Sequence, residues 1–342
     1  MFTPQYAISP KLLENIKRIS TISYELNHKQ FPKIVLMALL KQAHEISAHA
    51  STSIEGNPLP LTEVKRIIKS RPAHIRNSEQ EVLNYNNALV WLDDIKKKEH
   101  PSFNRPFLLQ IHKIVTHKLL SPGRSGKIRQ EPVFVNDPQI GKTVYWPPDH
   151  QDVITLLNDL LAFVAHNKKI LDPLLIAGIF HKQFVIIHPF MDGNGRTVRL
   201  ATKVLLSAMG LNTFNLFSFE NYYNQKISQY FKYVGVKGNY YDLKDRIDFT
   251  PWLEYFTDGI IDELLRVSQI LEQKKITPET VLLSQHHIIL DYIKKHGYIT
   301  DKIYSTLTPR AKPTRNQDFA KLIRLQLVER VGKGKSTLYR IK

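Results

Sequence analysis

A chain of 342 residues exceeds one typical domain, so two or three folding units are expected. The sequence contains no cysteine, which excludes disulfides and thiolate metal sites. No apolar run reaches the length of a membrane span, and residues 1–5 lack the basic start of an export signal. These features predict a soluble, cytoplasmic protein. The formal net charge of +17 points to nucleic acid or an acidic protein as a partner.

Apolar residues at helical spacing dominate the first half of the chain. They predict helices over residues 10–26, 33–48, 78–97, 105–119, 153–167 and 172–184. One stretch, residues 133–148, instead carries two β-rich segments around Asn136-Asp137 and Gly141, which predicts a hairpin. The fold class indicated by these patterns is mainly α with a short hairpin.

A twelve-residue run between two apolar segments is the most informative feature of the chain. It reads His188-Pro189-Phe190-Met191-Asp192-Gly193-Asn194-Gly195-Arg196-Thr197-Val198-Arg199. Two glycines between apolar segments predict a loop leading into a helix N-terminus, where free N–H groups and the helix dipole bind anions. Arg199 follows Arg196 by three residues, so the two guanidiniums can share one helix face.

Each of these residues also has an ordinary explanation. His188 could cap a helix or fill a core, the two glycines could form a simple turn, and the arginines could be a solvated helix face. Their coincidence in one short loop favours phosphate chemistry instead. A base, a carboxylate suited to a metal, a nest of N–H groups and two guanidiniums are the groups that such chemistry uses.

The run resembles the signature of Fic-domain proteins, His-Pro-Phe-x-Asp-Gly-Asn-Gly-Arg-x-x-Arg, and matches it at every fixed position. Residues 181–187 and the segment 122–129 further upstream also resemble the family. The resemblance implies a helical Fic core with a β-hairpin flap over the active site. It implies transfer of AMP from ATP to a Ser, Thr or Tyr hydroxyl of a target protein, and of the enzyme itself, with release of pyrophosphate.

The resemblance assigns chemical roles within the run. His188 would be the base that takes the proton of the attacking hydroxyl. Asp192 would hold a Mg²⁺ that bridges the α- and β-phosphates. Phe190 is expected to face the core and to fix the loop.

The remaining residues of the run would bind ATP. This set is Gly193, Asn194, Gly195, Arg196, Thr197, Val198 and Arg199. Backbone N–H groups of residues 193–195 would cradle the phosphates, and glycine is needed there because a Cβ would block their close approach. Arg196 would grip the α- and β-phosphates, and Arg199 the γ-phosphate.

A second motif, Ser51-Thr52-Ser53-Ile54-Glu55-Gly56-Asn57, fits the Ser/Thr-x-x-x-Glu-Gly/Asn pattern of the inhibitory helix in Fic proteins. The resemblance makes Ser51, Glu55 and Gly56 inhibitory residues, with Glu55 competing for Arg199. The alternative is an ordinary helix end, with Gly56 as its cap and Glu55 on the surface. A charge-assisted hydrogen bond contributes about 1.5–3 kcal/mol, or about ten- to a hundred-fold in a conformational equilibrium.

Two further sites follow from the resemblance. The flap, residues 133–147, would hold a segment of the target protein by strand-like main-chain pairing. Tyr230, Phe231 and Asn239 would border the adenosine, although the family's aromatic pair is Tyr-Tyr and one phenolic contact is therefore missing here. Core packing is the equally weighted alternative for these three residues.

The pattern changes from residue 281 onward. Helices are predicted over residues 284–296, 301–307 and 315–327, followed by a hairpin of residues 328–331 and 337–341. This order resembles a winged helix, whose third helix can enter the major groove of DNA. Gly334-Lys335-Ser336 is a wing turn rather than a phosphate loop, because Glu329 stands where that motif needs glycine.

The C-terminal module carries much of the positive charge. Residues 301–342 contain eleven Lys or Arg against three Asp or Glu, so 11 − 3 gives a net charge of +8. DNA is one partner that this charge fits, and an acidic protein or a solvated basic tail are the alternatives. The sequence leaves this choice open.

The predicted organisation has four parts. Residues 1–100 form an N-terminal helical region with an inhibitory helix at about 33–56, residues 101–260 the Fic core, 261–280 a helical connector, and 281–342 the winged helix. The predicted function is a protein adenylyltransferase inhibited by its own Glu55. The alternatives are a winged-helix transcriptional regulator with a nucleotide-sensing Fic core, or a Fic enzyme that removes AMP. The target protein, the release signal and the oligomeric state, a homo-oligomer included, are left open.

Overall fold

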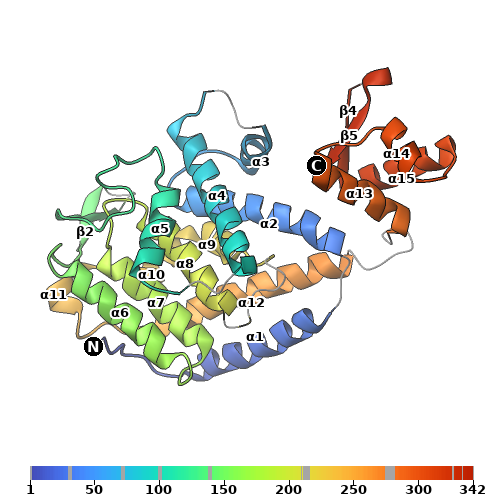
Figure 1. Cartoon of the computed structure of the whole chain (residues 1–342). Helices are drawn as coiled ribbons and strands as arrows, with labels where there is room; N and C mark the ends of the chain where they lie inside the picture. The colour runs from blue at the N-terminus through green and yellow to red at the C-terminus, as the bar shows by residue number, and fades with distance from the viewer. Residues whose placement is uncertain are drawn as a thin grey trace. The chain divides into compact units, whose positions relative to one another are not determined.

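A computed structural model of the chain divides into two compact units, Met1–His28 with Gln42–Ser268, and Lys29–Lys41 with Gln269–Lys342. The residues that the structure describes are 2–29, 33–70, 74–98, 102–137, 141–208, 210, 216–273, 282–325, 327–332 and 334–341. Figure 1 shows the order of the helices and strands along the chain. Helices account for most of both units, so the predicted mainly α class is confirmed.

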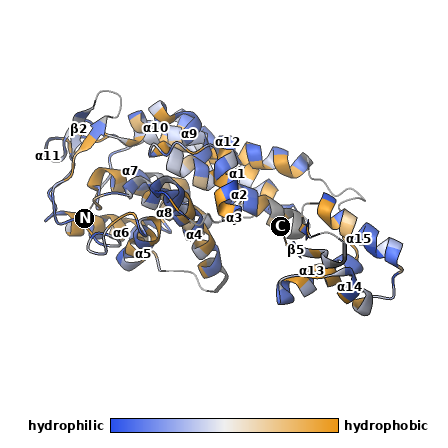
Figure 2. Cartoon of the chain, turned by 90° about the horizontal axis from the view of Figure 1, so that it is seen from above, coloured by the Kyte–Doolittle hydropathy of each residue, from blue (hydrophilic) through white to orange (hydrophobic). Residues whose placement is uncertain are grey.

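The first unit is built from helices around one buried helix. In chain order they are α1 (Pro10–His28), α2 (Lys33–Ile54), α3 (Leu61–Ser70), α4 (Asn77–Lys98), α5 (Arg105–Val115), α6 (Val153–Asn167), α7 (Pro173–Ile187), α8 (Asn194–Ala208), α9 (Phe219–Gln225), α10 (Ile227–Val234), α11 (Tyr240–Leu243) and α12 (Thr250–Gln273). Residues 33–41 of α2 and 269–273 of α12 belong to the second unit. In Figure 2 orange and blue residues alternate along most of these helices, as expected for elements with one face in a core. The short α3 was not predicted from the sequence.

Helix α7 is the central element of the first unit. Asp172 caps its N-terminus by accepting a hydrogen bond from the backbone N–H of Leu174 (2.8 Å), and Pro173 fits the first turn. Nearly every residue of α7 is buried, because α6 and α8 pack on it. Gly178 allows α12 to approach, since a Cβ there would lie 2.6 Å from Leu253 Cδ2.

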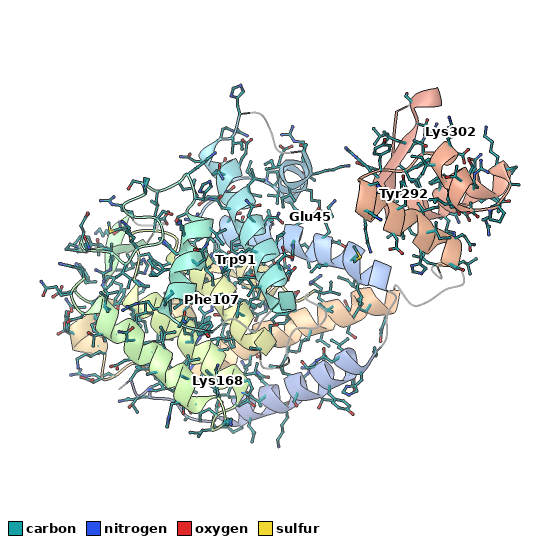
Figure 3. All side chains as sticks on the ribbon, viewed as in Figure 1. Glu45, Trp91, Phe107, Lys168, Tyr292 and Lys302 are labelled. Atoms are coloured by element: carbon teal, nitrogen blue, oxygen red, sulfur yellow. The ribbon has the colours of Figure 1, made fainter. Side chains whose placement is uncertain are left out.

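Aromatic packing joins α4 and α5 beside this core. Trp91 of α4 stacks on Phe107 of α5 with 5.7 Å between ring centroids, and both are labelled in Figure 3. Helix α5 ends at Val115, so the predicted extent to residue 119 was wrong. The cause is local, since Thr116 caps the helix and Lys118 has a φ of 60°, which is the left-handed region.

The predicted hairpin is confirmed and belongs to a small three-stranded sheet. Strand β1 (Val135–Asp137) pairs antiparallel with β2 (Lys142–Trp146), and residues 138–140 of the predicted flap lie outside the described residues. Strand β2 also pairs parallel with β3 (Gly238–Asn239), with Tyr145 opposite Gly238. That pairing was not predicted, because it joins segments about ninety residues apart.

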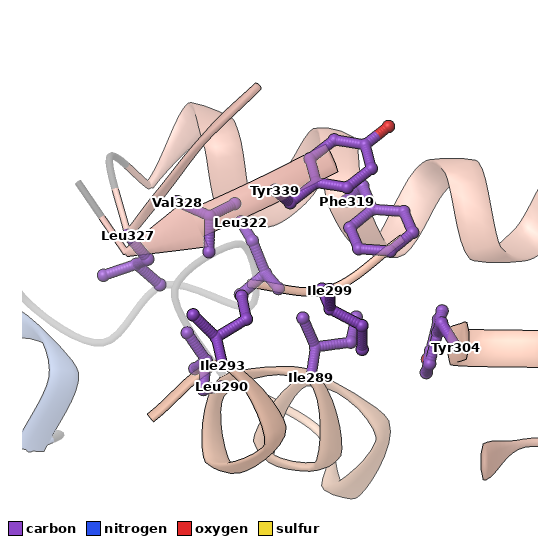
Figure 4. Packing of buried hydrophobic residues seen from close by; sticks show 10 residues of the cluster. All are labelled: Ile289, Leu290, Ile293, Ile299, Tyr304, Phe319, Leu322, Leu327, Val328 and Tyr339. Atoms are coloured by element: carbon purple, nitrogen blue, oxygen red, sulfur yellow. The ribbon is translucent and has the colours of Figure 1, made fainter. Parts of the chain in front are cut away.

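The second unit has its own core, shown in Figure 4. It contains α13 (Ser284–His296), α14 (Asp301–Leu307), α15 (Lys312–Arg324) and an antiparallel pair of strands, β4 (Val328–Val331) and β5 (Leu338–Ile341), with a 3₁₀ turn at Gly334–Ser336. Phe319 of α15 stacks on Tyr339 of β5 at 3.8 Å, and both pack with Ile289 of α13. Helix α15 begins three residues before the predicted residue 315, because Pro313 suits a first turn.

The structure marks no break at the predicted start of the connector, residue 261, and does not describe its predicted end, residue 280. Helix α12 runs through residues 260 and 261 without a break, and residues 274–281 lie outside the described part. Within the helices that the structure describes, none combines the length and apolar character of a membrane span.

Candidate active site

His188 lies at the C-terminal end of α7 in a left-handed conformation, with φ 50° and ψ 61°. Its backbone N–H still donates to Phe184 O (3.0 Å), so the residue closes the helix and turns the chain outward. Its ring Nδ1 lies 3.2 Å from Val185 O and donates to that carbonyl, which leaves Nε2 as the unprotonated nitrogen of the neutral ring.

The pKa of His188 is lowered. Burial is the largest cause, the Val185 carbonyl opposes it, and the positive charge of Arg129 lowers the pKa further. The carboxylates of Glu55 and Asp192 raise it by smaller amounts. The sum favours a neutral imidazole, which is the protonation state that a general base needs.

The loop of residues 188–194 is held by hydrogen bonds to its backbone. The Asn194 side chain accepts from Phe190 N and donates to Phe190 O, both at 2.9 Å. The Phe190 ring is fully buried and stacks on His112 at 3.7 Å, so the expectation that Phe190 faces the core is confirmed.

His112 of α5 is a loop contact that the sequence did not reveal. Its Nε2 donates to Asp192 O (2.9 Å), and its Nδ1 accepts from Gly126 N (2.9 Å). Burial lowers the pKa of His112 to about 4, which keeps this tautomer neutral. One sequence signal pointed toward it. Gly126, which donates to His112, lies in the segment 122–129 that resembles the family.

Two glycines allow the chain to approach the start of α8. Gly193 has a φ of 78°, and a Cβ there would lie 2.9 Å from Thr116 Cγ2. A Cβ on Gly195 would collide with Glu55 Oε1 and lie 2.9 Å from Arg199 Nη1. The Glu55 carboxylate therefore occupies the space directly above the N-terminus of α8, where an anion is expected to bind.

Arg199 is fully buried and is bound by the end of α2. Its Nη2 donates to Glu55 Oε1 (2.6 Å) and to Ser51 O (2.9 Å), and its Nε donates to Ser51 Oγ (2.8 Å). Burial is the largest single influence and disfavours its charge, but the Glu55 carboxylate, together with Tyr230 and Tyr85, raises the pKa of Arg199 overall. Gly56 follows with a φ of 90°, so the motif also ends the helix. The two distant motifs are thus in direct contact.

Arg196 forms a different set of ion pairs. Its Nη1 lies 2.6 Å from Glu81 Oε1, and its Nη2 lies 3.0 Å from Asp192 Oδ2. Glu81 in turn accepts from Asn57 Nδ2 (2.7 Å), directly after the Ser51–Gly56 motif. Glu81 was missed in the sequence, and Asn57 was given no role within its motif, because their contact depends on α4 packing beside α8. Thr197 and Val198 are buried in the first turns of α8.

Asp192 is the exposed carboxylate of the loop. Its side chain is 56% exposed, and it accepts from Gly193 N (2.6 Å) and from Arg196. The described residues contain no cluster of three or more side chains suited to a metal. A single exposed carboxylate nevertheless fits Mg²⁺, which proteins bind through one or two carboxylates plus substrate phosphates.

The three residues predicted to border adenosine have different surroundings. Tyr230 is buried, stacks on Tyr223 at 4.7 Å, and places its hydroxyl 3.4 Å from Arg199 Nη1. Phe231 is 45% exposed, and Asn239 is exposed at the start of α11. The side chain of Tyr230 is therefore closed to a ligand from solvent, whereas Phe231 and Asn239 are accessible.

Similarity to known proteins agrees with this geometry. Residues 102–206 match the family model described as Fic/DOC family. The chain is 28% identical over 208 residues to protein adenylyltransferase fic-1 of Caenorhabditis elegans, covering 60% of this chain and 39% of that protein. It is 30% identical over 177 residues to protein adenylyltransferase Fic of Nematostella vectensis, covering 50% and 39%. The chain therefore spans about two fifths of the length of these relatives.

Solved structures show the same fold. A Fic family protein from Desulfovibrio desulfuricans G20 superposes with a TM-score of 0.66 at 20% identity, covering 100% of this chain and 98% of that one. Residues 134–508 of Fic-1 from C. elegans superpose with a TM-score of 0.59 at 20% identity, covering 77% and 74%. The segment that carries His188, Arg196 and Arg199 is a Fic domain.

Proposed function

We propose that this chain is a protein adenylyltransferase, which transfers AMP from ATP to a Ser, Thr or Tyr hydroxyl of a target protein and releases pyrophosphate. The observation that carries the proposal is the arrangement around α8. A neutral histidine, a glycine-lined helix N-terminus whose space the Glu55 carboxylate fills, and two buried arginines converge within one loop and one helix. Relatives named protein adenylyltransferase support the reaction type.

His188 would act as the general base. Its Nδ1–H is held by the Val185 carbonyl, so Nε2 can take the proton of the acceptor hydroxyl as its oxygen attacks the α-phosphorus. The new P–O bond forms while the bond from the α-phosphorus to the bridging oxygen of pyrophosphate breaks. Pyrophosphate leaves with the electron pair of that bond.

The start of α8 would hold the triphosphate. Backbone N–H groups of residues 193–195 and the helix dipole would face the phosphate oxygens, with Arg196 on the α- and β-phosphates and Arg199 on the γ-phosphate. Asp192 would hold a Mg²⁺ together with these oxygens, and the ion would neutralise charge that develops on them. Phe231 and Asn239 would border the adenosine, and the buried Tyr230 would act through Arg199.

Glu55 would inhibit the enzyme by occupying this site. Its carboxylate binds Arg199 and lies where a side chain at position 195 would lie, so it competes with phosphate both for the guanidinium and for the space. The γ-phosphate would then lack its arginine, and ATP would bind in an unproductive pose. Ser51 adds two further acceptors to the same guanidinium.

Labelled ATP tests the proposal. Wild type, Glu55→Gly and Glu55→Gly/His188→Ala would each be incubated with α-labelled ATP, and label on protein would be counted. Label in Glu55→Gly that the double variant lacks supports AMP transfer. Loss of label from previously modified protein, dependent on Glu55, would support the removal of AMP instead. Absence of label in all three would contradict the transferase.

The charges of the second unit favour DNA as a further ligand. Asp301 is paired with Arg315 (2.8 Å), Glu329 with Arg340 (2.7 Å), and Asp318 is buried against the Tyr304 hydroxyl (2.9 Å). The acids among the described residues of 301–341 are therefore engaged within the unit. The exposed residues of α15 include the basic or polar Lys312, Asn316, Gln317 and Arg324, which are suited to contacts in a DNA groove, beside the exposed Ile323.

Duplex binding by the full chain tests this second proposal. Anisotropy of a labelled duplex should rise with added protein, and the affinity should fall with salt. Lys312→Glu with Arg324→Glu should weaken binding at least about tenfold, and the exposed Lys168 of the first unit (Figure 3) gives a matched control in Lys168→Glu. No binding at low salt would remove DNA and favour an acidic protein partner.

A further inference from the structure

Arg129 is a buried arginine outside the signature run, 3% exposed, in the segment between α5 and β1. Each of its three guanidinium nitrogens donates a hydrogen bond. Nε donates to His188 O (2.8 Å), Nη1 to Glu131 O (3.1 Å) and Nη2 to Pro148 O. Its backbone N–H donates to Pro189 O (3.0 Å). All four acceptors are main-chain carbonyls, so these hydrogen bonds of Arg129 fix the backbone rather than other side chains.

The positions of these carbonyls matter more than their number. His188 and Pro189 begin the loop that carries the proposed base. Glu131 precedes strand β1 and Pro148 follows strand β2, so these two residues are the two roots of the flap. One rigid, planar guanidinium thus joins both roots of the flap to the residue that would accept the proton.

We propose that Arg129 is a positioning residue that fixes the flap relative to His188, so that a segment paired with the flap presents its hydroxyl to the imidazole. The inference rests on the proposed AMP transfer. Among the strands of the described residues, β1 pairs only with β2, which leaves its other edge available to a target strand. A displacement of about 1 Å between reacting groups can cost about a hundredfold in rate.

A second contact supports the same geometry. The hydroxyl of Tyr145, a buried residue of β2, donates to Ile186 O (2.9 Å), one residue before the end of α7. Flap and helix are therefore joined at two points. The charge of Arg129 also faces His188 together with Glu55 and Asp192 of neighbouring elements, and it favours the neutral ring.

The test uses the full chain with Glu55→Gly present throughout, so that transfer is measurable. Arg129→Lys keeps the charge but cannot reach three carbonyls, and Arg129→Gln also removes the charge. Tyr145→Phe deletes the second contact and keeps the ring. Arg124→Lys is the matched control, because Arg124 lies in the same segment but is exposed and pairs with the Glu131 side chain.

Three measurements separate positioning from a merely structural role. We expect Arg129→Lys to lower kcat about ten- to a hundredfold, with KM for ATP changed by less than about twofold. Amides of residues 131–137 and 141–148 should exchange hydrogen at least about tenfold faster in Arg129→Lys and in Tyr145→Phe, but not in Arg124→Lys. The acidic limb of the pH–rate profile should move to higher pH in Arg129→Gln, because a positive charge near His188 is lost.

Equal flap exchange in all variants would overturn the inference, and so would kcat within about twofold of the parent. A parallel loss of kcat, ATP affinity and thermal stability would show a structural role and would also overturn it. If the Glu55→Gly parent transfers no AMP, the proposed function fails, while the exchange measurement still decides whether Arg129 holds the flap.

Discussion

The loop that precedes α8 is held through its backbone, whereas the contact of the end of α2 with α8 includes a carboxylate paired with a guanidinium. Asn194, His112 and Arg129 bind main-chain atoms of residues 188–192. By contrast, Glu55 reaches Arg199 with a carboxylate that is 29% exposed. Backbone bonds keep one geometry whether or not a ligand is present. A carboxylate on a guanidinium can be exchanged for a phosphate oxygen, so only the second contact has the chemistry of a switch.

Among substitutions in the loop that is held through its backbone, replacement of His188 should have the largest effect on the rate of AMP transfer. His188→Ala is expected to lower AMP transfer at least about a thousandfold while leaving ATP binding intact, because no other imidazole lies in the loop. His188→Asn is the sharper variant, since asparagine tolerates the left-handed conformation of this residue. Near-parental transfer by either variant, counted by radiolabel, would end the role of His188 as base.

Glu55→Gly should remove the exchangeable contact, the ion pair between Glu55 and Arg199. Transfer is expected to rise at least about tenfold, because Arg199 becomes available to the γ-phosphate. Adding Arg199→Ala should lower the rate again. If Glu55 is only structural, the single variant will unfold at lower temperature with no gain in rate, and thermal unfolding beside the rate assay distinguishes the two.

Ser51→Ala should weaken the binding of Arg199 to the end of α2, with a smaller rise in the rate of transfer. It removes the Oγ acceptor of Arg199 Nε but keeps the Ser51 carbonyl, so about 1 kcal/mol is lost and transfer should rise about fivefold. Ser53→Ala on the same helix is the control, because Ser53 lies off the buried face of α2. Equal rates for the two variants would show that Ser51 Oγ does not stabilise the closed state.

Acidification should weaken the fold through buried histidines. His181 of α7 lies between Thr202 Oγ1 (3.0 Å) and the Tyr230 hydroxyl (3.2 Å), and burial, with Arg199, lowers its pKa far below the ordinary value. Because the unfolded chain binds the proton more readily, this contribution is complete above about pH 6.5 and is lost as pH falls below it.

Denaturant unfolding at several pH values measures this dependence. His181→Gln should reduce the loss of unfolding free energy by up to about 1.4 kcal/mol per pH unit below about pH 6.5. His188 and His112 act in the same direction, so the variant should keep part of the slope. A slope that His181→Gln leaves unchanged would show that His181 is not buried in its neutral form.

The sequence predicted what is local and missed what depends on packing. Helices such as α6 have strong apolar periodicity and were found with their correct bounds, and the signature run placed α8 and its loop. The start of α15 was misplaced because Pro313 was not used as a start signal. Periodicity cannot reveal which distant side chain meets a loop. Glu81, His112 and Arg129 therefore became visible only in three dimensions.

Because Gly195 has no side chain, the space beside it can hold either a phosphate oxygen or the Glu55 carboxylate. The open space above it admits a phosphate oxygen in the proposed reaction, and Glu55 fills the same space in this structure. A residue larger than glycine at 195 would expel the carboxylate and obstruct the nucleotide in a single step. If the proposed inhibition holds, substitution at this position cannot release it without obstructing the nucleotide. Substitution of Glu55, in the terminal turn of α2, would free the same space and leave the residues proposed to bind ATP unchanged.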